Sequence, residues 1–132
     1  MANLLDSKGN LDELSGVERI KAESGGLHGR IAEELGRPTD HFEDDTIKLL
    51  KHHGTYQQDN RDTRRERKKQ GLDREYTMMV RTKFPGGRLN ADQYILCDGL
   101  CTKYGQNDLR ATSRQDFQFH GVVKGNLRPI IH

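Results

Sequence analysis

The sequence is poor in large apolar side chains. Leu, Ile, Val and Phe together make 28 of the 132 residues, and tryptophan is absent. That fraction is close to the level below which chains bury too little apolar surface to fold. Charged residues make up 32% of the chain, but its 22 basic and 20 acidic residues nearly cancel. The composition therefore excludes a uniformly basic protein that binds along nucleic acid, and it predicts a polar domain with a small apolar core.

Long apolar runs, a leader and a cysteine framework are also missing. No run approaches the roughly 20 apolar residues of a membrane span, so no membrane partner is expected. The N-terminal MANLLD has neither a basic nor an apolar region, so no signal peptide is expected. Two cysteines make no disulfide framework. Together these absences predict a protein of the reducing cytoplasm.

Residues 1–72 are polar, and their few apolar side chains recur at helical spacing. Ser15 and Glu18 have the spacing of a capping box, and Gly36 followed by Pro38 ends a helical pattern. The helices expected here cover residues 11–20, 27–35 and 43–51. Because this part has little to bury them against, we interpret it as a mostly helical, extended N-terminal arm that lies on something else.

Residues 73–132 follow the pattern of an α+β unit. Asn90, with Gln93 three residues later, predicts the start of a helix that stops before Gly105. That helix is expected to bury Tyr94, Leu96, Cys97, Leu100 and Cys101. Strands are expected over residues 76–84, 109–112 and 117–123, and a further helix near Pro129. The order β-α-β-β predicts a ferredoxin-like half-domain that is truncated before its closing helix.

Cys97 and Cys101 are four residues apart on the expected helix, so both thiols lie on one face. They are either half of a metal site or two small side chains packed under a sheet. A metal site needs about four ligands, and the chain has no further cysteine and no H-x-x-x-H pattern. We therefore expect packing and assign no metal ligands.

The segment RDTRRERKK, residues 61–69, carries six positive and two negative charges. Such a run can bind nucleic acid. However, Asp59, Asp62 and Glu66 interleave with the arginines at helical spacing, which favours ion pairs within the segment and a solvated face. No aromatic side chain alternates with the run to stack on bases. No nucleic-acid partner is therefore expected.

The densest polar cluster is the segment LRATSRQDFQFHGVV. Gln118 and His120 alternate with two phenylalanines, so they share one face of the expected strand. Arg110 and Arg114 lie on or next to the strand before it. Burying such a face is costly unless it holds an anion, and arginine forks suit carboxylates, phosphates and oxyanions. Arg81, inside the first apolar strand, either extends this face or points to solvent.

Four motifs together resemble the siroheme-containing sulfite and nitrite reductases. In chain order they are HGTYQQDNRD at 53–62, MVRTKFPGG at 79–87, LR and RQ at 109–115, and FQFHG at 117–121. Residues 17–35 also resemble the N-terminal arm of the family, and the YQQD form is closer to sulfite reductase hemoproteins than to assimilatory nitrite reductases. The resemblance implies an N-terminal arm at 1–72 and an incomplete first half-domain at 73–132.

In that family, siroheme coupled to a 4Fe–4S cluster carries the electrons of a six-electron reduction, of sulfite to sulfide or of nitrite to ammonia. The resemblance implies that Arg110, Arg114, Gln118 and His120 cradle the siroheme carboxylates or line the siroheme pocket. It also implies that Arg81 binds the anionic substrate, because a fixed positive charge there stabilises the bound oxyanion.

The chain departs from the family pattern at several positions. Lys83 stands where family members carry a second arginine, and His52 where they carry a bulky apolar residue. Asp116 adds a negative charge where a neutral residue is usual. The cysteines that ligate the cluster lie far downstream in the family. Cys97 and Cys101 are therefore not assigned to it, and the cluster ligands are expected to be absent from this chain.

The leading hypothesis is the N-terminal portion of an assimilatory-type sulfite reductase hemoprotein of sulfur metabolism, inactive alone. Its expected partners are the missing C-terminal half of the reductase or a full-length reductase, and a ferredoxin or flavoprotein as electron donor. The alternative is a non-catalytic module that binds siroheme or another anion, or docks on a reductase. Nitrite stays open as the substrate instead of sulfite.

Overall fold

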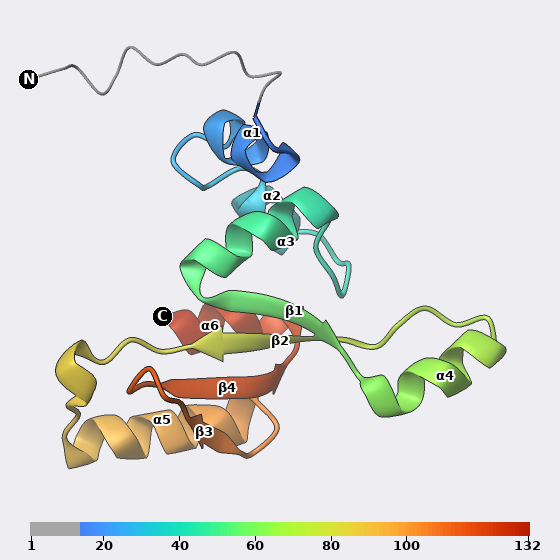
Figure 1. Cartoon of the computed structure of the whole chain (residues 1–132). Coiled ribbons are helices and arrows are strands. Elements are labelled where there is room, and N and C mark those ends of the chain that lie inside the picture. Colours follow the sequence, from blue (N-terminus) through green and yellow to red (C-terminus); the bar gives the residue numbers. More distant parts are fainter. Residues whose placement is uncertain (1–13) are drawn as a thin grey trace, which may run out of the picture.

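The computed structural model describes residues 14–132 and has the expected α+β architecture (Figure 1). The strands are β1 (Thr55–Asp59), β2 (Tyr76–Arg81), β3 (Leu109–Ala111) and β4 (Phe117–Val122). The helices are α1 (Gly16–Glu23), α2 (Ile31–Leu35), α3 (Asp44–Leu50), α4 (Arg61–Lys69), α5 (Ala91–Tyr104) and α6 (Leu127–Ile131). Short 3-10 helices are η2 (Lys51–His53), η3 (Pro85–Gly87) and η4 (Lys124–Asn126). Within this described part, no helix is long and apolar enough to cross a membrane.

The strands form one antiparallel sheet in the order β1-β2-β4-β3. The unit β2-α5-β3-β4 has its last strand between the other two, as expected of a ferredoxin-like half-domain. β1 pairs with the other edge of β2, from Thr55 opposite Val80 to Asp59 opposite Tyr76. The sequence analysis missed β1, because it treated this segment as part of the arm.

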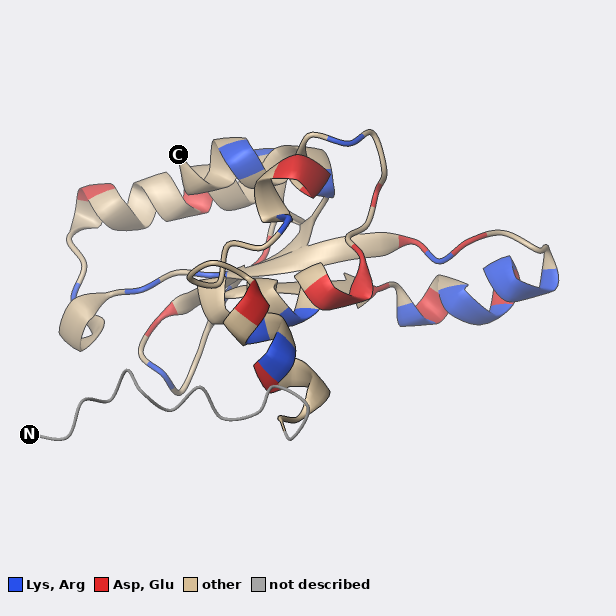
Figure 2. Ribbon diagram, turned by 90° about the horizontal axis from the view of Figure 1, so that it is seen from above, with Lys and Arg blue, Asp and Glu red and all other residues tan. Residues whose placement is uncertain are grey.

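One face of the sheet carries the apolar core. Met78 and Val80 of β2 and Phe119 and Val122 of β4 are buried there. The same cluster contains Cys97 and Cys101 of α5, Leu127 and Ile130 of α6, and Phe42 and Leu50. Figure 2 shows α5 and α6 on the same side of the strands. The packing role expected for the two cysteines therefore agrees with the structure.

The segment before β1 packs on the sheet of its own chain. Phe42 and Leu50 are only 2% and 5% exposed and belong to the same core. The buried Lys124 in η4 donates a hydrogen bond to Oγ1 of Thr39 at 2.7 Å, and its ammonium lies 4.8 Å from the centre of the Phe42 ring. The expectation that this part of the arm lies on something else is therefore wrong for the residues around α3.

Two helix starts were predicted correctly and one was not. The side chain of Ser15 accepts the N–H of Glu18 at 3.3 Å, and Asn90 forms the reciprocal capping box at the start of α5. Leu27, by contrast, has a φ of +68°, which a helix does not allow. α2 therefore begins only at Ile31. Residues 11–13 of the first expected helix lie outside the described residues.

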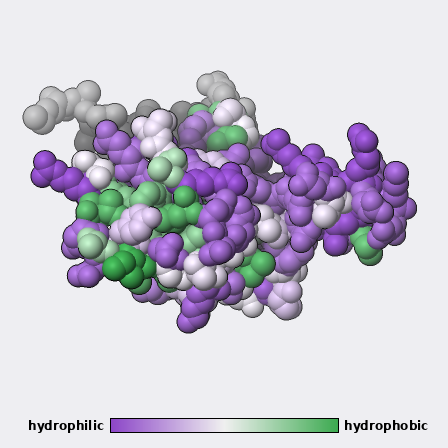
Figure 3. Space-filling model, turned by 90° about the horizontal axis from the view of Figure 1, so that it is seen from below, coloured by the Kyte–Doolittle hydropathy of each residue, from purple (hydrophilic) through white to green (hydrophobic). Residues whose placement is uncertain are grey.

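α5 presents a narrower face to the core than expected. Cys97 and Cys101 are buried, but Tyr94 and Leu96 are 51% and 61% exposed. The buried positions are four residues apart and face the sheet, whereas Leu96 lies around the helix from them. Figure 3 shows apolar atoms gathered on the underside of the molecule, where α5 lies. The expected burial of Tyr94 and Leu96 is therefore wrong.

α4 projects from the body between β1 and β2 (Figures 1 and 2) and buries none of its side chains. Arg64 forms an ion pair with Asp59, with 2.5 Å between Nε and Oδ2. Among the described residues, no ion pair joins Asp62 or Glu66 to an arginine of this helix. The expected pairing within the segment is therefore found only at Asp59.

A β-bulge in β4 keeps the two faces of the sheet distinct. Val80 pairs with Phe119, but Met78 pairs with Val122, so β4 has one residue more than β2 between these pairs. Gly121, with a φ of +68°, lies within the bulge. A Cβ atom there would lie 2.7 Å from Cβ of Gln106. The bulge lets both Phe119 and Val122 face the core.

We expect Gly121→Ala to lower the free energy of unfolding by about 1–3 kcal/mol, because it combines a left-handed backbone with a steric clash. Urea unfolding followed by circular dichroism measures the change. The matched control is Gly125→Ala, where a Cβ meets nothing within 4 Å, and we expect it to change stability by less than about 1 kcal/mol. Equal stability of the two variants would contradict the role of the bulge.

Candidate functional site

A row of polar side chains crosses the open face of the sheet. Gln118 in β4 is paired with Arg81 in β2 on one side and with Arg110 in β3 on the other. His120 follows on the same face, and its Nε2 lies 3.0 Å from Oε1 of Gln118. Phe119, between them in sequence, faces the core. The alternation therefore places the polar side chains as the sequence analysis expected.

Arg81 and Arg114 line one cavity of roughly 620 Å³, which we call the Arg81 cavity. Arg110 and His120 line a second cavity of roughly 620 Å³, which we call the His120 cavity. Gln118 lies between them in the sheet, since its strand partners are Arg81 and Arg110. The sequence predicts a siroheme cradle of Arg110, Arg114, Gln118 and His120, with Arg81 apart as the substrate residue. The structure instead places Arg114 with Arg81 in one cavity and Arg110 with His120 in the other, and Gln118 lines neither.

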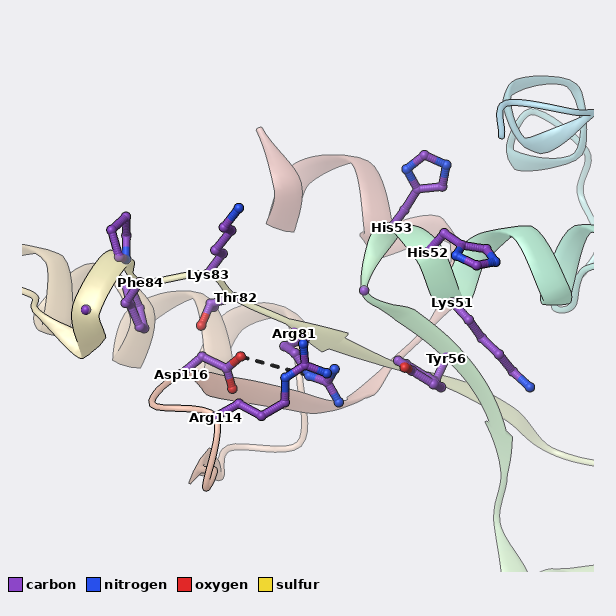
Figure 4. A pocket seen from close by; sticks show the side chains of 13 residues that line it. Lys51, His52, His53, Tyr56, Arg81, Thr82, Lys83, Phe84, Arg114 and Asp116 are labelled. Carbon is purple, nitrogen blue, oxygen red and sulfur yellow. Dashed lines mark ion pairs between the residues drawn. The ribbon is translucent and has the colours of Figure 1, made fainter. Parts of the chain in front are cut away.

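The Arg81 cavity is rich in positive charge (Figure 4). Its charged side chains are those of Lys51, Arg81, Lys83, Arg114 and Asp116. η2 brings Lys51, His52 and His53 to the rim, and Gly54, with a φ of +74°, ends it. The oxygen of Gly54 then accepts the N–H of Arg81 at 2.8 Å. Four cations against one carboxylate make this cavity suited to an anion.

The guanidinium of Arg81 is held between an aromatic ring and a carboxylate. Its Cζ lies 5.4 Å from the centre of the Tyr56 ring, and its Nε lies 4.0 Å from Oδ2 of Asp116. The Arg81 side chain is only 18% exposed, and its buried Nε has no hydrogen-bond partner among the described residues. Arg81 therefore lies on the polar face with its Nε buried and unpaired, and the alternative that it simply points to solvent does not hold.

Lys51 and Tyr56 belong to the site but were not singled out from the sequence. Tyr56 is part of the quoted YQQD motif, yet its ring is placed beside Arg81 only because β1 pairs with β2. Lys51 ends α3, in a segment with no motif of its own. Recognising a strand over residues 55–59 is the one signal that would have found both.

His120 in the second cavity is partly buried. Burial lowers the pKa of His120, the charge of Arg110 lowers it further, and Asp108 opposes both. Oδ2 of Asp108 accepts hydrogen bonds from Arg110 at 3.2 Å and from Gln106 at 3.0 Å. The Arg110 side chain is 54% exposed. An incoming carboxylate would therefore share or replace Asp108 on this guanidinium.

Metal ligands are not grouped in the described part of the chain. No set of three or more His, Cys, Asp or Glu side chains within residues 14–132 is arranged to hold a metal ion. Cys97 and Cys101 are free thiols on the core side of α5, and burial raises the pKa of both. These thiols do not fit a cluster site, because they are enclosed by apolar side chains rather than by a cavity.

The depressed pKa of His120 makes stability depend on pH. In the unfolded chain histidine titrates near its ordinary value, about 6.5, and in the folded chain His120 takes up its proton only at lower pH. Between these two values the unfolded state binds more protons, so stability is lost as pH falls through the window. When the pH is lowered from 7.5 to about 5, the free energy of unfolding should therefore fall in both proteins. We expect the fall to be smaller in the His120→Gln variant than in the unchanged protein.

Urea titrations at the two pH values measure this difference. His132→Gln is the control, because His132 is exposed at the chain end. An identical pH dependence in the unchanged protein and the His120 variant would refute the proposed effect of burial.

Comparison with known proteins agrees with this geometry. Residues 69–132 match the model of the nitrite/sulfite reductase ferredoxin-like half domain. A sulfite reductase (NADPH) hemoprotein beta-component of Acidithiobacillus ferrooxidans is 47% identical over 119 residues, which are 89% of this chain and 21% of that protein. Proteins of the same name from Xylella fastidiosa and Staphylococcus haemolyticus are 45% and 43% identical, over 86% and 97% of this chain and 20% and 22% of their own lengths.

The chain spans about a fifth of the length of these curated relatives. The match covers nearly all of the chain, including the segment with β1 and α4, and not only the half-domain. The chain belongs to the nitrite and sulfite reductase hemoprotein family, and it carries the family's ferredoxin-like half-domain together with the segment that precedes it.

Proposed function

We propose that this chain is the part of a sulfite reductase hemoprotein that binds siroheme carboxylates and the substrate anion. In the whole enzyme it would contribute to the six-electron reduction of sulfite to sulfide. The observation that carries the proposal is the row Arg81–Gln118–Arg110, which crosses three strands on the polar face of the sheet. This row brings three predicted site residues together from separate motifs.

The residues of the His120 cavity fit a group with several carboxylates. Arg110 presents a half-exposed guanidinium, and Arg61 and Arg64 of α4 line the same cavity. Guanidinium groups bind carboxylates in pairs of charge-assisted hydrogen bonds. Gln118 fixes the ring of His120 through its amide oxygen. Siroheme, when bound, would carry electrons from the donor to the substrate, and these side chains would hold and orient its carboxylates.

The Arg81 cavity fits the substrate. The Arg81 guanidinium, whose Nε has no hydrogen-bond partner among the described residues, lines this cavity with a second arginine and two lysines. Such a group of cations can bind a small oxyanion and stabilise negative charge that develops on it. Arg114 lines this cavity and not the other. We therefore propose that Arg114 acts at the border between substrate and cofactor.

The 4Fe–4S cluster is assigned to other parts of the enzyme. The cysteines of this chain lie in the core, so they do not fit cluster ligation. We propose that the chain alone does not reduce sulfite and that it works with the rest of the reductase and with a ferredoxin or flavoprotein donor. A location in the reducing cytoplasm stays a prediction, as do nitrite as substrate and the alternative of a non-catalytic siroheme- or anion-binding or docking module.

We expect Arg110→Gln to weaken siroheme binding by about 10- to 100-fold, the effect of losing a charge-assisted bidentate pair. The shift of the siroheme absorption band on titration with the purified chain measures the affinity. Arg128→Gln, an exposed change on α6, is the control and should leave the affinity unchanged. Equal affinity of the unchanged protein and the Arg110 variant for siroheme would show that Arg110 does not bind the siroheme carboxylates.

A second experiment separates the enzyme part from the non-catalytic module. The chain is mixed with the remaining portion of a related sulfite reductase hemoprotein, loaded with both cofactors, and sulfide production is measured with a chemical reductant. We expect activity from the mixture and none from either part alone. Tight siroheme binding without activity in the mixture would favour the non-catalytic module.

A further inference from the structure

Asp116 is an almost enclosed carboxylate in a cavity that otherwise carries positive charge. Its side chain is 9% exposed, and the other charged residues that line the Arg81 cavity are Lys51, Arg81, Lys83 and Arg114. Figure 4 shows Asp116 directed toward Arg81. Asp116 is therefore the single negative charge among the described residues that line this cavity.

Hydrogen bonds to Thr112 and, through the adjacent Phe117, to Thr82 hold Asp116 in place. Its Oδ1 accepts a hydrogen bond from the hydroxyl of Thr112, and its backbone oxygen accepts the N–H of the same residue at 3.0 Å. The next residue, Phe117, is bonded through its N–H and its oxygen to the hydroxyl of Thr82, at 2.9 and 3.0 Å. Thr82 directly follows Arg81, so these hydrogen bonds hold the backbone segments that carry the guanidinium and the carboxylate next to each other.

The distance between the Asp116 carboxylate and the Arg81 guanidinium allows electrostatic attraction but no hydrogen bond. Oδ2 of Asp116 lies 4.0 Å from Nε of Arg81, which is beyond hydrogen-bond distance. Coulomb attraction acts at this range, whereas the donors of Arg81 are not used by the carboxylate. Asp116 therefore lowers the positive potential of the cavity without accepting a hydrogen bond from Arg81.

We propose that Asp116 is a resident counter-ion that biases the Arg81 cavity toward singly charged oxyanions over doubly charged ones. The inference rests on the proposed function of this cavity as the substrate-anion site. A fixed negative charge repels a dianion about twice as strongly as a monoanion at the same position, because Coulomb energy is proportional to ligand charge. The donors that recognise the oxygens are the same for both ligands.

The test uses nitrite as the monoanion and sulfate as the dianion, titrated separately into the full chain at one pH and one ionic strength. Affinity is measured by calorimetry, and the NMR signal of the Arg81 Nε–H group reports where the ion binds. Asp116→Asn keeps an oxygen for the Thr112 hydroxyl and removes the charge. We expect it to tighten nitrite binding about threefold and sulfate binding about tenfold.

For each ion, the affinity of the Asp116→Asn variant is divided by the affinity of the unchanged protein. This ratio does not depend on the size and shape of the ion. Asp45→Asn, which removes an exposed carboxylate paired with Lys48 on α3, is the matched control and should leave both affinities within about 1.5-fold. Asp116→Ser provides a second neutral variant, should Asp116→Asn fail to fold, and the same preferential gain in sulfate affinity is expected.

The outcomes separate this inference from the proposed function. If Arg81→Gln abolishes binding of both ions but the Asp116 variants bind them as the unchanged protein does, the site stands and the counter-ion role is wrong. Equal gains for nitrite and sulfate, or weaker sulfate binding, would also overturn it. If neither ion perturbs the Arg81 signal in any variant, the substrate-anion site and this inference both fail.

Discussion

The site depends on a sheet that packs its apolar core on one face and gathers its polar side chains on the other. In β4 this separation would fail after Phe119 if the strand simply alternated, because Val122 would then turn to the polar face. The bulge at Gly121 resets the alternation, so Phe119 and Val122 both enter the core. Gln118 and His120, which flank Phe119 in the sequence, lie together on the open face. Packing on one side of the sheet thus orders the polar groups on the other.

Much of this arrangement could be predicted from sequence because short-range rules govern it. The capping box at Asn90 and Gln93, the glycine at position 105 and the alternation through Phe117–Val122 each act over a few residues. Those rules located α5, β3 and β4 within a residue or two. They also predict that Gln118 and His120 share one face, as they do in the structure. The resemblance to the reductase family rests on the same segments.

The rest depended on long-range pairing that the sequence does not display. β1, TYQQD, has only one aromatic and no aliphatic residue, because one of its faces is open and its stability comes from pairing with β2. Without β1 there was no reason to place Tyr56 beside Arg81 or to divide the site into two cavities. On α5, the apolar residues outnumber the positions that face the sheet, so Tyr94 and Leu96 were assigned to the core although they are exposed.

Three arginines of the polar face lie next to carboxylates of the same chain. Arg110 binds Asp108, Arg64 binds Asp59, and Arg81 lies near Asp116. Such pairs reduce the cost of holding arginines close together in a protein whose core is thin. They differ in how much they obstruct a ligand, because Asp108 and Asp59 occupy guanidinium donors and Asp116 does not. Binding at Arg110 or Arg64 therefore exchanges one carboxylate for another, whereas an anion that binds at Arg81 has no hydrogen-bonded carboxylate to displace.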